Sequence, residues 1–233
     1  MTMNIWRPST RLPLVVFCVL ATCVAAVSCD RQEQLSDGHL RRVAAAARQK
    51  GESSAVMGYF DEPNLFGSSL ADALEHYSFL TAVATPAQQV EVAPDEIRTW
   101  FIFDGAGHVA GARTAGPRCG TLRLPTNVKL SDGQLAMPLR IGSADVDGIR
   151  LTMQGADSEL TLRPGQKYLL IVQLCPDQVI RPSYGALSVF YVDSQGGIRP
   201  VVTSKPNQTA TSVLDGLGTI ERLREAGEGK NDQ

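Results

Sequence analysis

Three histidines are the side chains of this sequence best suited to acid–base chemistry near neutral pH, namely His39, His76 and His108. A histidine that acts as a catalytic base must contact a nucleophile, and no serine lies in a G-x-S-x-G or S-x-x-K motif. We expect His39 in an N-terminal tether, His76 on a short helix and His108 in the glycine-rich loop Gly105–Gly111. A hydrolase site near His108 is therefore the enzymatic alternative, whereas a non-enzymatic protein is favoured.

Pairs or clusters of carboxylates could support glycoside hydrolysis or calcium binding. Asp61-Glu62 and Asp95-Glu96 each lie beside a proline, where turn formation accounts for them. Asp145, Asp147 and Asp157 surround one predicted hairpin but lack the terminal Glu of an EF-hand loop. Cysteine and histidine do not occur at the spacing of a zinc or thioredoxin-type motif. We therefore expect no metal and no cofactor.

Aromatic side chains supply the predicted binding surface. Trp100 and Phe101 lie in one predicted strand, Glu96–Phe103, and Tyr191 lies in a later one. Because side chains alternate along a strand, Trp100 and Phe101 point to opposite faces. Aromatic rings outside the core could stack a sugar or a peptide, so Trp100, Phe101 and Tyr191 are the candidate binding residues.

The first 28 residues have the order of a secretory signal. Arg7 and Arg11 precede an uncharged run from Leu12 to Cys29, whose second half consists mainly of small residues. A membrane span is the alternative, since about 20 apolar residues cross a bilayer. The small residues favour cleavage, and we predict residues 1–28 as a signal peptide.

The stretch Ala26-Val27-Ser28-Cys29 resembles a bacterial lipobox, in which the cysteine is lipidated and becomes the mature N-terminus. Ala26 stands where a larger aliphatic residue is commoner, so a conventional cut after Ala26 or Ser28 stays open. An Asp after the lipidated cysteine resembles a signal for retention in the inner membrane, and Asp30 occupies that position. The resemblance implies a lipoprotein that faces the periplasm.

The remaining cysteines support export. Cys18 and Cys23 would leave with the signal and Cys29 would carry lipid, which leaves Cys119 and Cys175. An even number in an oxidising compartment predicts a disulfide between them. Two separate buried thiols are the alternative.

Residues 29–50 are polar and then rich in alanine, with Leu40, Val43 and Ala47 at helical spacing. We predict a tether that contains a short helix, His39–Gln49. A solvated tether is favoured, and contact of its arginines with anionic lipid headgroups is the alternative.

Residues 51–210 carry short runs of β-branched and aromatic residues separated by turn residues. A helix capped by Ser69 precedes the first strand, Phe79–Thr85, which Pro86 closes. The continuously apolar Tyr168–Leu174 is predicted as a central strand. We predict a mainly β domain, an antiparallel barrel or sandwich of about six to eight short strands. Residues 211–233 are predicted as a C-terminal helix, Val213–Arg224, and a frayed tail.

Two hairpins are predicted in this domain. The first joins Leu135–Ile141 to Ile149–Met153, and Pro138 predicts that its first strand lies at a sheet edge or bulge. The second joins Ala186–Val192 to Ile198–Val202. Leu122–Leu124 and Asn127–Leu130 are weaker strand candidates.

The passages LADALEHYSFLTAVAT, IRTWFIFD and RPGQKYLLIVQL resemble elements of exported bacterial proteins of unknown function. Their arrangement is also similar to the five-stranded oligonucleotide/oligosaccharide-type barrel of netrin and metalloproteinase-inhibitor-like modules. The chain lacks the N-terminal Cys-x-Cys and the dense disulfides of the inhibitor-like modules, so protease inhibition is not implied. The resemblance implies an exported β-barrel domain.

The charge balance argues against a nucleic-acid-binding protein, because 22 basic against 24 acidic residues give a net charge of −2 rather than a basic excess. Removal of residues 1–28 takes away two arginines and makes the chain more acidic. We predict a lipid-anchored, non-enzymatic binding or scaffold protein of the cell envelope, with an envelope protein or a glycan as its partner.

Overall fold

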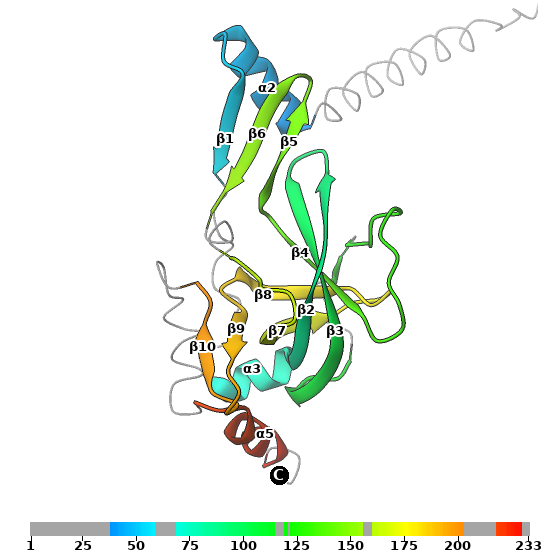
Figure 1. The fold of residues 1–233 in the computed structure, drawn as a ribbon, viewed down its shortest axis with the longest axis vertical. Helices are drawn as coiled ribbons and strands as arrows, with labels where there is room; N and C mark the ends of the chain where they lie inside the picture. Colours follow the sequence, from blue (N-terminus) through cyan, green and yellow to red (C-terminus); the bar gives the residue numbers. More distant parts are fainter. Residues whose placement is uncertain are drawn as a thin grey trace, which may run out of the picture.

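The computed structural model describes residues 38–58, 69–114, 119–120, 122–155, 160–202 and 218–229. The fold is mainly β, as predicted, with two separate sheets that are decorated by short helices (Figure 1). Neither sheet is closed into a barrel. The predicted signal peptide, Cys29 and the pair Asp61-Glu62 lie outside the described residues.

The described helices are α2 (His39–Gln49), α3 (Leu70–His76) and α5 (Ile220–Glu228). The described strands are β1 (Ser54–Gly58), β2 (Ser78–Val92), β3 (Ile97–Gly111), β4 (Leu135–Leu139), β5 (Gly142–Val146), β6 (Ile149–Gln154), β7 (Lys167–Leu174), β8 (Ile180–Ala186), β9 (Val189–Val192) and β10 (Ile198–Pro200). The predicted helix α2 and the Ser69-capped helix α3 are confirmed, and Ser69 accepts a hydrogen bond from the Asp72 amide.

The larger sheet has seven antiparallel strands in the order β10-β9-β7-β2-β3-β4, with β8 also paired to β7. β7 is buried on both faces, which confirms the central strand that its continuous apolar sequence predicts. β4 is the last strand of the order, so Pro138 lies on an edge strand as predicted. An isolated bridge joins Ala136 to Val179, but no ladder extends it, and the sheet stays open.

β2 and β3 form a long hairpin of two 15-residue strands. The prediction that Pro86 ends the first strand is wrong: Ala84 faces Phe103 and Gln88 faces Phe101, so residues 85–87 form a bulge. A proline in a bulge does not interrupt the ladder, because its missing N–H is not needed there.

The prediction of a glycine-rich loop at Gly105–Gly111 is also wrong, because these residues continue β3. Gly107 pairs with Thr81, and Gly111 pairs with Ser78. Gly111 has a φ of +85°, and a Cβ there would lie 2.1 Å from the carbonyl oxygen of Tyr77. These glycines therefore serve close strand contact rather than a flexible loop.

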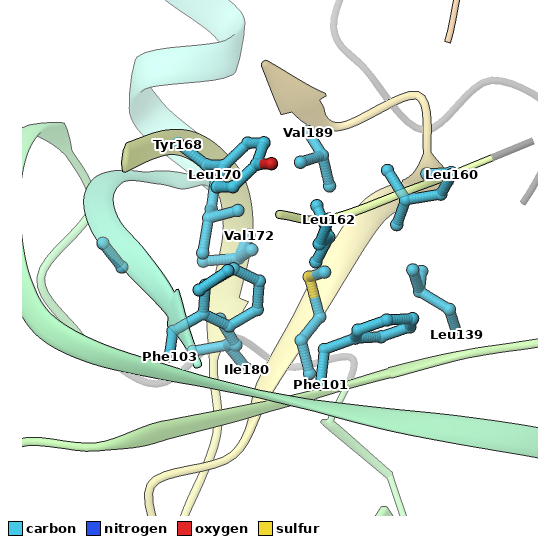
Figure 2. Close-up of a cluster of buried hydrophobic side chains, with 14 of the residues drawn as sticks. Phe101, Phe103, Leu139, Leu160, Leu162, Tyr168, Leu170, Val172, Ile180 and Val189 are labelled. Atoms are coloured by element: carbon cyan, nitrogen blue, oxygen red, sulfur yellow. The ribbon is translucent and has the colours of Figure 1, made fainter. Parts of the chain in front are cut away.

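The core of the larger sheet lies on its two faces. On one face the sheet curves around apolar side chains from β2, β3, β7 and β8, and Leu160 and Leu162 fill the space between them (Figure 2). On the other face, helices α3 and α5 cover β3, β7 and β9, with Leu74 and Leu223 in one apolar cluster with Ala110 and Ile171. Both helices thus belong to the β domain.

The smaller sheet has the order β1-β6-β5, with β1 parallel and β5 antiparallel to β6. Helix α2 buries Leu40, Ala44 and Ala47 against this sheet and against Ile97 of β3. The favoured prediction of a solvated tether for this helix is wrong. Its alanines permit close approach to the strands, and burial of the apolar stripe stabilises the contact.

The first predicted hairpin has a different first strand. β5, not Leu135–Ile141, pairs with β6 across Asp147-Gly148, and both turn residues have positive φ. This is the two-residue turn that an Asp-Gly pair favours. The apolar Leu135–Leu139 segment pairs with β3 in the larger sheet instead. The second hairpin is confirmed as β9 and β10, but its strands are shorter than predicted, because Ala186 ends β8 instead.

The C-terminal helix is displaced from its prediction. α5 starts after its cap Thr219 and extends to Glu228, so residues predicted as a frayed tail are helical. Thr219 accepts a hydrogen bond from the Arg222 amide, which fixes this start. Residues 213–217 of the predicted helix lie outside the described part of the chain.

Candidate functional site

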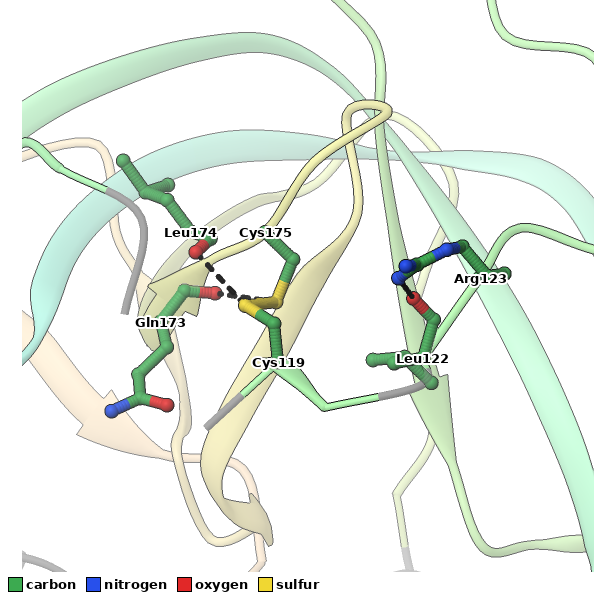
Figure 3. Close-up of a disulfide and its surroundings, with 6 residues drawn as sticks. All are labelled: Cys119, Leu122, Arg123, Gln173, Leu174 and Cys175. Carbon is green, nitrogen blue, oxygen red and sulfur yellow. Dashed lines mark hydrogen bonds between the residues drawn. A yellow bond between two sulfur atoms is a disulfide. The ribbon is translucent and has the colours of Figure 1, made fainter. Parts of the chain in front are cut away.

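The predicted disulfide is present between Cys119 and Cys175, with an S–S distance of 2.09 Å and a Cα–Cα distance of 5.5 Å (Figure 3). Cys175 directly follows β7, and Cys119 lies in the connection between β3 and β4. The Cys119 sulfur lies 3.1 Å from the carbonyl oxygen of Leu174. The bridge therefore holds this connection against the end of the central strand.

The connection behind the disulfide covers one face of β3 and β4. Its apolar residues pack on Trp100, Ile102 and Ala136; they are Leu122, Leu124, Val128 and Leu130. The two weak strand candidates in this segment are wrong, because the segment is irregular and pairs with no strand. Alternating apolar residues occur here because the segment lies flat on a sheet face.

The structure corrects the predicted aromatic binding surface. Trp100 is 0% exposed and Phe101 is 5% exposed, so neither ring can stack an external ligand. They do point to opposite faces of β3, as predicted, but both faces are covered. Tyr191 on β9 is half-buried and is the remaining member of the candidate set.

Trp100 belongs to a small charged network. Its Nε1 donates a hydrogen bond of 2.7 Å to Glu91 Oε2. Arg98 lies 3.8 Å from the same oxygen and also pairs with Glu96, which in turn pairs with Arg140. Two carboxylates are thus balanced by two guanidinium groups, and the network fixes one face of the β2–β3 hairpin. Sequence reasoning did not find it, because its members join only when the strands pair.

His108 lies in β3 and contacts backbone groups. Its Nε2 lies 3.2 Å from the carbonyl oxygen of Gly111, while its Nδ1 is buried and has no hydrogen-bond partner among the described residues. Burial and the nearby charge of Arg113 lower the pKa of His108, although hydrogen bonds to Gly111 and Ala112 oppose this shift. None of these partners is a nucleophile or a carboxylate.

The other two histidines lie on helices. His76 closes α3, where its Nδ1 lies 2.9 Å from the Asp72 carbonyl oxygen. His39 is the first residue of α2 and is exposed. The three histidines thus lie on three different elements: His39 on α2, His76 on α3 and His108 on β3.

The carboxylate candidates also have structural partners. Asp95 accepts a hydrogen bond from the His39 amide, and Asp145 pairs with Arg150 at 3.1 Å. Asp147 occupies the β5–β6 turn, and Asp157 lies outside the described residues. Within the described ranges, no group of three or more His, Cys, Asp or Glu side chains is placed to bind a metal ion.

Across the described part of the chain, no helix combines the length and the apolar character needed to cross a bilayer. Neither a family model, nor a curated protein, nor a solved structure matches this sequence.

Proposed function

We propose that this chain is an exported protein of the cell envelope, lipid-anchored through Cys29, with a non-enzymatic binding or scaffold domain. The observation that carries the proposal is the Cys119–Cys175 disulfide. Disulfides persist in oxidising compartments such as the bacterial periplasm and are rare in the cytosol. The bridge thus supports the same compartment as the signal-like N-terminus.

Only a short stretch of chain separates Cys29 from the described domain. The described domain begins at Gly38, nine residues after Cys29, and nine extended residues span at most about 32 Å. A lipid on Cys29 would keep the domain close to the membrane surface. Asp30 supports retention in the inner membrane, with the domain in the periplasm.

The partner class is an envelope protein or a glycan. Nucleic acid is not proposed, because the chain has no basic excess. The hydrolase alternative near His108 is not carried forward, because the hydrogen bonds of this ring are to backbone groups and the nearby charge is that of Arg113.

Replacement of the lipidation residue tests the anchor. The full chain and its Cys29→Ala variant are expressed in a bacterial host, and their distribution between membrane and soluble fractions is compared. Cys23→Ala is the matched control, since Cys23 lies in the same apolar segment but outside the lipobox-like stretch.

We expect Cys29→Ala to lose the membrane fraction and Cys23→Ala to keep it. Mass spectrometry of the wild-type N-terminus should find a lipidated Cys29. An unchanged membrane fraction for Cys29→Ala, or a mature N-terminus that lacks lipid, contradicts the anchor. If Cys119 and Cys175 stay reduced in the expressed protein, that result contradicts export itself.

A further inference from the structure

The second half of β2 is a free strand edge. β7 pairs with β2 only from Ser78 to Val83, whereas β3 follows β2 as far as Val92. Within the described ranges, no strand pairs with the other edge of Gln88–Val92. Figure 1 shows this part of the hairpin projecting beyond β7 and β9. Its outward backbone groups are available to another strand.

Two exposed valines mark the same edge. Val90 is 43% exposed and Val92 is 52% exposed. Because they alternate along β2, both lie on one face of the strand, the face that carries Ile97 and Thr99 on β3. Ile97 and Thr99 are buried, so the apolar surface left open lies at the outer margin of the hairpin.

The segment Gln88–Val92 itself carries few of the features that usually protect a sheet edge, although the bulge at residues 85–87 lies beside it. Gln88–Val92 contains no lysine and no proline, and Pro86 and Pro94 lie on either side of it. Its one charged residue, Glu91, is turned to the opposite face, where it accepts the Trp100 hydrogen bond and lies near Arg98. The charge of Glu91 therefore does not shield the valines.

We propose that Gln88–Val92 pairs in antiparallel fashion with the same segment of a second copy of this chain, about a two-fold axis at Val90. The sequence favours this register. Val90 then faces its own copy, Gln88 faces Val92, and Gln89 faces Glu91, so an amide meets a carboxylate. An axis at Glu91 would instead place two carboxylates opposite each other, which destabilises a strand pair.

The pairing joins the larger sheets of two copies through their hairpins. Each copy contributes a short segment, so the interface is small and we expect a weak, concentration-dependent dimer. The proposal does not depend on the lipid anchor or on the compartment.

Cysteine cross-linking tests the register in the full chain. In Val90→Cys the two new thiols meet on the axis, so we expect a disulfide-linked dimer on non-reducing gels. Val92→Cys faces Gln88 of the other copy and should stay largely monomeric. Val56→Cys is the matched exposure control, because Val56 is 61% exposed on β1, away from the hairpin edge.

Sedimentation of the purified full chain gives a second, independent measurement. The wild-type average mass should rise toward twice the monomer mass as concentration increases. Val90→Lys should remain monomeric, because a lysine disfavours strand pairing at a sheet edge and two lysines would face each other across the axis. Val56→Lys should behave as the wild type does.

Three results would overturn the proposal. The first is equal cross-linking of Val90→Cys, Val92→Cys and Val56→Cys, which would indicate random collision. The second is a wild-type protein that stays monomeric up to its solubility limit. The third is cross-linking of Val90→Cys to a different protein, which would assign the edge to a foreign strand.

Discussion

At the scale of single residues, buried polar groups determine how the long hairpin is built. Trp100 is fully buried, and its N–H finds a carboxylate partner in Glu91 across the strand pair. A buried donor without an acceptor costs about 1–3 kcal/mol, so this hydrogen bond favours the strand register that places Trp100 on the same face as Glu91. His108 differs from Trp100, because its Nδ1 is buried and has no hydrogen-bond partner among the described residues.

This difference predicts a pH-dependent stability that originates at His108. Its pKa in the folded protein is lowered from 6.5. Between the lowered value and 6.5, the unfolded chain binds more protons than the folded one, so the free energy of unfolding rises with pH. The contribution is complete above 6.5 and is lost as pH falls below 6.5 toward the folded pKa.

We expect His108→Gln to flatten the pH dependence of the urea unfolding midpoint in this range. His76→Gln is the matched control, because His76 is exposed at the end of α3, and it should retain the wild-type slope. Equal slopes for His108→Gln and the wild type would contradict the assignment.

At the scale of elements, the sequence patterns predicted several structures that depend on local signals. Helix α2 has the predicted bounds, α3 begins after the predicted Ser69 cap, and β7 is the predicted central strand. Predictions failed where pairing partners decide the outcome. Gly105–Gly111 has the composition of a loop, but it forms strand because it pairs with β2. At Gly111 the backbone lies so close to the Tyr77 carbonyl that a side chain would not fit.

The candidate site residues follow the same division. The cysteine count predicted the disulfide, since only two of the five cysteines lie outside the predicted signal peptide and the predicted lipidation site. The prediction of an aromatic binding surface was wrong. Trp100 is buried by the irregular segment 122–130, and no local sequence pattern indicates where that segment packs. The cap of α2 could not be predicted either, because it comes from the distant Asp95.

This distant cap gives a prediction for α2. Its own N-cap, Gly38, has no side chain, and a Cβ there would lie 1.9 Å from the carbonyl oxygen of Pro94. Asp95 at the hairpin tip accepts the His39 amide hydrogen bond at 2.9 Å instead. We expect Asp95→Ala to lower the free energy of unfolding by about 1 kcal/mol in urea titrations.

Asp95→Asn retains an acceptor and should lose less than Asp95→Ala does. Asp132→Ala, in an exposed turn, is the control and should stay near the wild type. Equal losses for Asp95→Ala and Asp132→Ala would show that the tip does not cap the helix.

At the scale of the whole molecule, three kinds of attachment hold the two sheets and their coverings together. α2 packs on both the small sheet and Ile97 of the long hairpin, α3 and α5 cover one face of the large sheet, and the disulfide fixes the β3–β4 connection. The hairpin belongs to the larger sheet, and through Ile97 it also packs against α2 and the smaller sheet.

The disulfide cross-links two segments that are distant in the sequence, and its removal is expected to destabilise the fold. We expect the double variant Cys119→Ala/Cys175→Ala to lose about 2–5 kcal/mol of unfolding free energy in guanidinium titrations. Wild-type protein kept in a reducing agent should show a similar loss, which serves as the control. Identical midpoints for oxidised and reduced protein would mean that packing alone holds the connection in place.

The parallel pairing of β1 with β6 also sets an order of assembly. Ser54 pairs with Arg150, so β1 must wait for a strand made from residues much later in the chain. Contacts between distant segments form slowly, because a long loop must close first. The β2–β3 hairpin can form early from neighbouring residues, whereas β1 and the α2 face that packs on this sheet stay uncovered until β6 arrives. We expect β1 to gain hydrogen-exchange protection last during refolding, after the local β5–β6 hairpin.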